Sequence, residues 1–352
     1  MIFRYPTEFP ADAVERRVPD AVTARVLVRE RSPQLLELLA YRRERFATLI
    51  LARTDYPPPI AGAEDAVLMA FCRLAFRHGT WGKDFHAYHN EGHIFEILGP
   101  RLERLIDAIG IDALSLRDWF LLALFAATHD LRQREAPHYH AGIGSNERAS
   151  IEETFRILHA CGFTHAANAE VFIGIELMIA GSTFDARPPI PALEFNSAEL
   201  VVESGGALAQ KLDAKLDKHA SGWRDDARIA HALELALIAA DLDTANVAED
   251  FPLLMVSAER LCLEREMRSH RDPVDGVSAQ PMLNFLTSGQ EHYFFDLHRF
   301  SSPQGRTAFA AAKQANVQPM RRLIHDLRAA VPAPRTGNEV LAAFRALREK
   351  AR

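Results

Sequence analysis

Residues 115–130 read SLRDWFLLALFAATHD, and this stretch decides the fold class of the chain. Ser115 stands three residues before Asp118, which is typical of the capping box that begins an α-helix, with Asp in place of the usual Glu. The run that follows, Trp119 to Thr128, is apolar all round. A helix of this kind has no side suited to water, so we expect it to be central and buried.

Helical periodicity continues through the other long segments, and strand signals are nearly absent. Apolar residues recur at spacings of three and four, as on one face of a helix. The pair Asp275-Gly276 falls in a polar loop, and no such pair joins two alternating segments as in a β-hairpin. The predicted fold class is therefore all-α. Helices are expected at residues 147–161, 171–179, 200–219, 224–247, 253–269, 304–330 and 337–350.

Proline-rich stretches predict the domain boundaries. Tyr56-Pro57-Pro58-Pro59 would separate an N-terminal helical segment, residues 1–58, from a main domain at residues 59–332. Val331-Pro332-Ala333-Pro334 would precede a C-terminal helix in residues 333–352. The apolar face of residues 35–49 fits either packing on the same domain or pairing with a second copy in a homodimer.

Composition limits the class of partner. The 352 residues are 48% hydrophobic and 25% charged, which is typical of a globular protein, and the formal net charge of −6 gives no general attraction for nucleic acid or anionic membrane. The longest apolar run is too short to span a bilayer. The three cysteines are scattered, which indicates core residues in a reducing compartment. We expect a cytoplasmic protein with a small-molecule partner and neither a nucleic acid nor a membrane partner.

Groups that bind hard metal ions occur at separate places in the chain. His89 and His93 are four residues apart, so on a helix they would share one face. His129 and Asp130 end the apolar run, where buried polar groups are costly unless something pairs with them. Each pair also fits a purely structural role, as hydrogen-bonded histidines or as a helix-capping pair.

A further carboxylate lies within an apolar helical segment. Asp241 follows Ala239 and Ala240, and an aspartate in such a helix is rarely buried without a partner. Asp243 falls on a different face of the same helix. The alternative is a solvent-facing pair of aspartates. With the histidines and Asp130, Asp241 would complete a set of imidazole and carboxylate ligands for a divalent cation.

The order of these motifs is a His, then a His-Asp pair, then a distant Asp. This order resembles the signature of the HD superfamily of metal-dependent phosphohydrolases. Tyr88-His89-Asn90-x-x-His93 is similar to the Tyr-His-Asn-x-x-His motif of class I 3′,5′-cyclic nucleotide phosphodiesterases. Ala240-Asp241-Leu242 resembles the Ala-Asp-Leu motif of that family. Gln290 with Tyr293 resembles its base-recognising glutamine and aromatic clamp. The resemblance covers about residues 80–300.

The resemblance implies an HD-domain, phosphodiesterase-like helical bundle with extra N- and C-terminal helices. It also implies divalent metal ions, with Zn, Fe or Mn at a first site and Mg or Mn suited to a second. His89 would be the general acid, while Tyr88 and Asn90 would line the substrate site. Gln290 and Tyr293 would bind the nucleobase. The implied ligands of the first metal are His93, His129, Asp130 and Asp241.

The chain departs from the family pattern at Gln133, where the family has the second His of His-Asp-x-x-His. His138 or His140 would be the substitutes within reach, and Asn146 aligns loosely with a downstream Asn of the family. Glu147 lies in Asn146-Glu147-x-x-Ser150, which resembles an Asn-Glu-x-x-Ser stretch of other bacterial HD phosphohydrolases, and it would hold metal-bound water. A first-turn Glu favoured by the helix dipole is the alternative. The motifs leave open whether one metal ion or two would bind.

The implied activity is hydrolysis of a 3′,5′-cyclic nucleotide, cAMP or cGMP, to the 5′-monophosphate. One alternative is an HD phosphohydrolase that acts on another nucleotide or on a phosphomonoester. Gln133 favours this alternative, whereas the Gln290 region favours the cyclic nucleotide. Another alternative is a non-catalytic nucleotide sensor, against which the presence of all four ligand positions argues.

Overall fold

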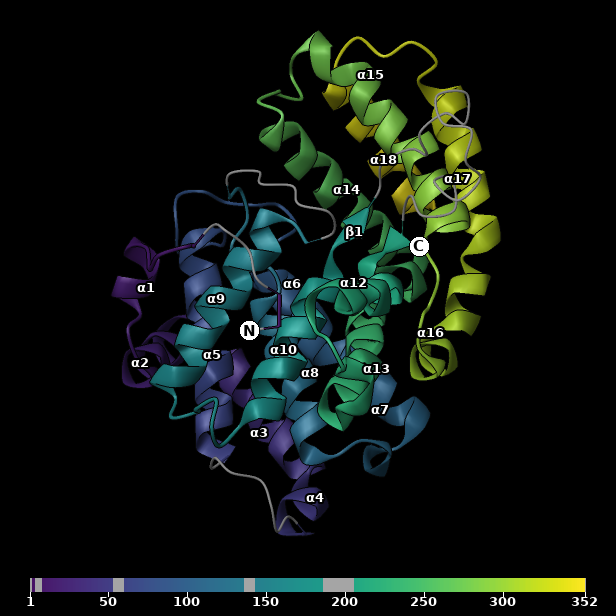
Figure 1. Ribbon diagram of the computed structural model, residues 1–352. Coiled ribbons are helices and arrows are strands. Elements are labelled where there is room, and N and C mark those ends of the chain that lie inside the picture. Colours follow the sequence, from purple (N-terminus) through teal and green to yellow (C-terminus); the bar gives the residue numbers. More distant parts are fainter. Residues whose placement is uncertain (1, 4–7, 53–59, 136–142, 186–205, 352) are drawn as a thin grey trace. The chain divides into compact units, whose positions relative to one another are not determined.

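The computed structural model describes residues 2–3, 8–52, 60–135, 143–185 and 206–351. Helices dominate this part of the chain (Figure 1). The described strands β1 (Phe184–Asp185) and β2 (Gly206–Ala207) have two residues each and pair with one another. The predicted all-α class is confirmed. None of the described helices is both long enough and apolar enough to cross a lipid bilayer.

Contacts divide the chain into two compact units. The first comprises Met1–Phe85, His89–Phe184 and Ala207–Asp243. Its helices are α1 (Ala13–Arg17), α2 (Ala21–Arg31), α3 (Pro33–Arg45), α4 (Ala47–Ala52), α5 (Ile60–Arg77), α6 (Glu91–Glu96), the π-helix η1 (Ile97–Arg101), α7 (Leu102–Ile109), α8 (Leu116–Thr128), α9 (Ser145–Ala160), α10 (Ala169–Ser182), α12 (Leu212–His219), α13 (Ala227–Asp243), and the 3₁₀ turns η2 (Ile111–Ala113), η3 (Leu208–Lys211) and η4 (Trp223–Asp225).

The second unit comprises His86–Tyr88, Asp185–Gly206 and Thr244–Arg352. Its described elements are the 3₁₀ helix η5 (Thr244–Ala248), α14 (Phe251–Arg268), α15 (Gly276–Asn284), the π-helices η6 (Phe285–Gly289) and η7 (His292–Leu297), α16 (Pro303–Ala315), α17 (Val317–Ala330) and α18 (Gly337–Lys350). The boundaries expected near residues 58 and 332 stay predictions. The proline loops at residues 56–59 and 187–191 lie outside the described residues.

Helix α8 is the centre of the first unit, as the opening sequence predicts. Its capping box is complete, because the Asp118 N–H donates to Ser115 Oγ at 3.2 Å and the Ser115 N–H donates to Asp118 Oδ2 at 3.0 Å. Every residue from Asp118 to Thr128 except Ala123 is buried. Helices α5, α10 and α13 pack against α8, and α10 also packs along α13 (Figure 1). The C-terminal end of α8, at His129, therefore lies in the interior of the first unit.

Some predicted helices have different limits in the structure. The helix predicted at residues 304–330 is two helices, α16 and α17, with a break at Asn316. Pro319 has no N–H to donate to the carbonyl four residues earlier, so the helix cannot run on unbroken. The buried Asn316 side chain instead donates to the Val247 carbonyl at 2.9 Å. The helix predicted at residues 224–247 ends at Asp243 and continues as the 3₁₀ helix η5.

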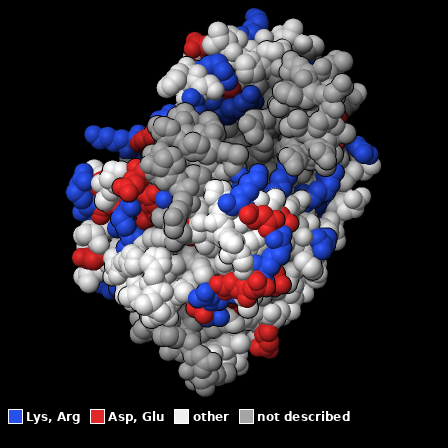
Figure 2. All heavy atoms as spheres, viewed as in Figure 1, with Lys and Arg blue, Asp and Glu red and all other residues white. Residues whose placement is uncertain are grey.

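The apolar face at residues 35–49 packs at least in part on its own unit. Leu35 and Phe46 are buried, and the Phe46 ring stacks on Trp119 of α8 with 5.9 Å between centroids. The homodimer stays a prediction. On the face that Figure 2 shows, Arg and Lys are interspersed with Asp and Glu among the described residues. The three cysteines are free thiols.

Replacing Leu122, which is fully buried in α8, tests the central position of this helix. Leu122→Ala is expected to lower the free energy of unfolding by about 2–5 kcal/mol, because it removes packed methyl groups and leaves a cavity. Urea denaturation followed by circular dichroism measures the change. Val22→Ala in α2 is the control, since Val22 is 74% exposed and its loss should change the free energy by less than about 0.5 kcal/mol. Equal effects of the two substitutions would contradict a buried α8.

Candidate metal centre

His129 is the C-cap of α8, and its ring orientation is set by the backbone of the preceding turn. Its Nδ1 lies 3.1 Å from the Phe125 carbonyl oxygen, to which it donates, and its ring stacks on the Phe125 ring at 4.7 Å. A histidine held through Nδ1 presents Nε2 as a lone-pair donor. Nε2 of His129 is buried and lies 3.0 Å from Oδ2 of Asp130, the next residue.

His93 brings a second imidazole from α6 to the same point. Its ring centroid is 5.5 Å from that of His129, and its Nε2 lies 3.9 Å from Asp130 Oδ2. Asp243, the last residue of α13, contacts both rings: its Oδ1 lies 3.0 Å from His93 Nε2 and 3.3 Å from His129 Nε2. Three helix ends in the first unit thus bring two imidazoles and two carboxylates together.

The spacing of these atoms fits a divalent cation. His93, His129 and Asp130 each offer one ligand atom, and these three atoms lie within 4.8 Å of one another. Ligands bound at about 2.1 Å in a tetrahedral site lie roughly 3.4 Å apart, close to the distances seen here. His129 Nε2 and Asp130 Oδ2 are also buried and make no hydrogen bond of acceptable geometry. Buried polar atoms without a hydrogen bond are costly, and a cation would satisfy both.

Electrostatics at the centre favours a positive charge. Burial would lower the pKa of His129, but the carboxylates of Asp130 and Asp243 outweigh it and raise that pKa well above its ordinary value. Burial would likewise raise the pKa of Asp130, yet the imidazoles of His129 and His89 lower it to about 2. Burial would also raise the pKa of Asp243, but the imidazoles of His129 and His93 hold that pKa well below its usual range. Without a bound cation, an imidazolium at His129 offsets the carboxylates.

A buried arginine ties the helix that carries His93 to the end of α13. Pro100 lacks an N–H, and the chain passes through this position as the π-helix η1. Arg101, at the end of η1, is buried and donates through Nη1 to the Asp243 carbonyl oxygen at 2.6 Å. Its Nη2 lies 3.3 Å from Glu96 Oε2, and the same oxygen lies 3.4 Å from Nδ1 of His93.

The two predicted catalytic residues adjoin the centre. His89 was expected on the helix with His93, but α6 begins at Glu91 because the Asn90 side chain caps it, accepting from the Gly92 N–H at 2.8 Å. The His89 ring still lies 6.2 Å from the His93 ring, centroid to centroid. Glu147 is in the first turn of α9, and burial together with the nearby charge of Asp130 raises its pKa.

The predicted ligand Asp241 is buried in α13, two residues before Asp243, and its ligand role stays a prediction. Sequence reasoning missed Asp243, because the family motif drew attention to Asp241 alone. The available signal was that both aspartates lie near the end of an apolar helix, although the sequence does not show at which residue that helix ends.

The predicted substrate-binding residues are distributed over both units. Tyr88 is buried, and its N–H donates to Glu264 Oε2 at 2.9 Å within the second unit. Gln290 is buried between η6 and η7 of that unit, and Tyr293 is partly exposed within η7. The Tyr293 ring packs against the edge of His298 at 5.6 Å. The roles of Tyr88, Asn90, Gln290 and Tyr293 stay predictions. His138 and His140 lie outside the described residues.

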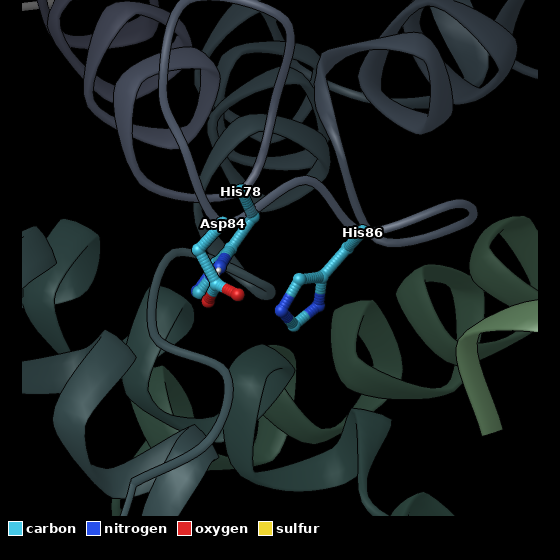
Figure 3. A group of neighbouring side chains, drawn as sticks. All are labelled: His78, Asp84 and His86. Carbon is cyan, nitrogen blue, oxygen red and sulfur yellow. Dashed lines mark ion pairs between the residues drawn. The ribbon is translucent and has the colours of Figure 1, made fainter. Parts of the chain in front are cut away.

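His78 and Asp84 form a pair that contacts the loop after α8 through Gln133. Nδ1 of His78 is 3.4 Å from Asp84 Oδ2 (Figure 3). His78 Nε2 accepts from the Gln133 N–H at 3.2 Å. His86, also labelled in Figure 3, is counted with the second unit, where its Nδ1 lies 3.3 Å from Glu264 Oε1. Both histidines therefore have partners within their own units.

A scan of the chain against models of known protein families finds no match, and a search of curated proteins finds no significant match. Sequence motifs and geometry therefore carry the functional argument.

Metal binding at this centre should release protons. Because the pKa of His129 is raised well above its ordinary value, a cation must displace a proton from this ring at neutral pH. The affinity for Zn²⁺ or Mn²⁺ is expected to fall roughly tenfold for each pH unit below the raised pKa. Calorimetry in buffers of different ionisation enthalpy counts the protons released.

Asp243→Asn removes one of the charges that raise the pKa of His129, so fewer protons should be released at neutral pH. An affinity that is independent of pH between 6 and 8 in the unaltered chain would contradict a centre built on His129.

Proposed function

We propose that the chain is a metal-dependent phosphodiester hydrolase that converts a 3′,5′-cyclic nucleotide to the 5′-monophosphate. The observation that carries this proposal is the convergence of His93, His129, Asp130 and Asp243 from three helix ends of one unit. The buried, unbonded His129 Nε2 and Asp130 Oδ2 support a cation at this point. The resemblance of the same motifs to HD phosphohydrolases supports the reaction class.

His93, His129 and Asp130 would hold the cation, with Asp243 and the predicted ligand Asp241 at the end of α13. A divalent cation bound there would polarise a phosphoryl oxygen and acidify a water molecule at neutral pH. Burial of the surrounding side chains strengthens these charge interactions, because little water screens them. Burial and the nearby charge of Asp130 raise the pKa of Glu147, and this closeness to Asp130 supports a role for Glu147 in orienting water.

His89 is the candidate proton donor to the leaving alkoxide. Its ring adjoins His93, and its charge contributes to the low pKa of Asp130, so the two groups attract each other. A ring that protonates the leaving oxygen must carry a proton, and the neighbouring Asp130 carboxylate attracts a positive charge at this position. From the sequence, Glu147 and Glu153 are the two candidates for a carboxylate that holds the imidazolium of this acid. Glu153 instead lies 2.9 Å from Arg77 Nη2, in a buried ionic cluster.

The sequence predicts Gln290 and Tyr293 as the residues that recognise the base. A buried glutamine amide both donates and accepts, which suits the edge of a purine, and an aromatic ring adds stacking of roughly 1–3 kcal/mol. Gln290 and Tyr293 offer these groups. The second candidate function is hydrolysis of another nucleotide or of a phosphomonoester, and Gln133, in place of the family's histidine, favours it.

A substrate panel distinguishes these functions. The chain, loaded with Mn²⁺ or Zn²⁺, is expected to release 5′-AMP or 5′-GMP from cAMP or cGMP, and a chelator should abolish the release because the cation supplies the acidified water. Chromatography of the products measures it. Release of orthophosphate from nucleoside monophosphates, with no turnover of either cyclic nucleotide, would replace the first function by the second. No hydrolysis by metal-loaded protein would reject an enzyme.

Substitution of His89 tests its role as the acid. His89→Ala is expected to lower turnover by about 10²–10⁴-fold with metal content unchanged, because the ring donates a proton and is not a predicted ligand. Asp241→Ala is expected to lose the metal as well. Steady-state kinetics and elemental analysis separate the two effects. His325→Ala, at an exposed position of α17, is the control. Normal turnover by metal-loaded His89→Ala would remove His89 from the mechanism.

A further inference from the structure

The two carboxylate oxygens of Asp130 have different surroundings. Oδ2 faces the imidazoles, 3.0 Å from His129 Nε2 and 3.9 Å from His93 Nε2. Oδ1 accepts a hydrogen bond from Nε2 of Gln133 at 2.8 Å. Both side chains are buried, with 9% of each residue exposed. One oxygen of Asp130 thus faces the two imidazoles and the other an amide.

Neighbouring hydrogen bonds fix which end of the Gln133 amide meets Asp130. The Glu135 N–H donates to Oδ1 of Asn146 at 3.0 Å, so the Asn146 amide must present Nδ2 on its other side. That Nδ2 donates to Oε1 of Gln133 at 3.2 Å, which leaves Gln133 Nε2 facing Asp130. The Gln133 backbone is held too, since its N–H donates to His78 Nε2 at 3.2 Å. The amide is therefore oriented by a chain of bonds that starts at a backbone N–H.

We propose that Gln133 limits this centre to one divalent cation by occupying the outer oxygen of Asp130 with an amide N–H. A carboxylate that bridges two cations uses both of its oxygens, and paired cations in phosphohydrolases lie about 3.5–4 Å apart. The amide nitrogen of Gln133 has no lone pair to offer a metal and directs hydrogens toward Oδ1. A second cation at Oδ1 would meet the hydrogens of this amide and would gain no ligand atom from it.

This inference rests on the metal centre of the proposed function and adds the number of divalent cations that the centre binds. With a single cation, the leaving group would depend on a protein proton donor such as His89, because no second cation would stabilise the leaving oxygen. A change at position 133 that provides a lone pair should therefore change the metal count.

The test counts Mn²⁺ in the full-length chain after equilibration with excess Mn²⁺ and gel filtration, by elemental analysis and by electron paramagnetic resonance. The unaltered chain is expected to hold one Mn²⁺ per chain with the spectrum of an isolated ion. Gln133→His and the isosteric Gln133→Glu are each expected to hold two, with a spin-coupled spectrum, because each supplies a ligand atom beside Asp130. Gln314→His, at an exposed position of α16, controls for adventitious binding to a new histidine.

Two spin-coupled ions in the unaltered chain would overturn the inference and leave the proposed hydrolase standing. No bound ion in the unaltered chain would overturn both. If Gln133→His and Gln133→Glu fold, as judged by circular dichroism, and both still hold one ion, Gln133 is not the limiting group and the inference fails. A count of two in the unaltered chain overturns the inference whether or not either variant folds.

Discussion

The cost of burying charge is the constraint on which this structure depends. Helix α8 is apolar from Trp119 to Thr128 and almost wholly buried there, so it delivers His129 and Asp130 to a place where little water reaches them. An isolated carboxylate in such surroundings is strongly disfavoured, and only an opposite charge at short range makes it tolerable. The chain meets this requirement by bringing His93 from α6 and Asp243 from α13 to the same point.

Backbone groups orient two of the polar side chains around the centre, those of His129 and Gln133. A carbonyl oxygen of α8 holds the ring of His129, and a backbone N–H begins the chain of bonds that orients Gln133. Such partners do not change rotamer, so the donor atoms are arranged before any ligand arrives. Preorganisation of this kind is what a metal site or a catalytic site requires, since no energy is then spent on arranging the groups during the reaction.

Much of the fold and part of the centre could be predicted from the sequence. The capping box at Ser115 and the apolar run after it are local signals, and they located α8 and the His129–Asp130 pair that ends it. Asp243 could not be chosen over Asp241 in this way. Which aspartate meets the histidines depends on where α13 stops and how it packs, and both are tertiary properties.

Other differences have local causes that periodicity does not reveal. On a regular α-helix the three-residue spacing of Gln290 and Tyr293 would put both on one face, whereas the chain there contains the π-helices η6 and η7. The prediction of one helix over residues 304–330 gave too little weight to Pro319. His89 was expected on a helix because of its spacing from His93, yet Asn90 is a strong N-cap and starts α6 after it.

The contact between Arg101 and α13 has a consequence for how this protein can vary in evolution. Arg101 donates to main-chain oxygens of Leu242 and Asp243, which any residue would offer at those positions. Side chains in this last turn can therefore drift without loss of the anchor. An insertion or deletion within α13 cannot be absorbed in the same way, because each added residue turns the helix end by about 100° and carries the aspartates out of register. Among homologues, the length of this helix should be kept more strictly than its composition.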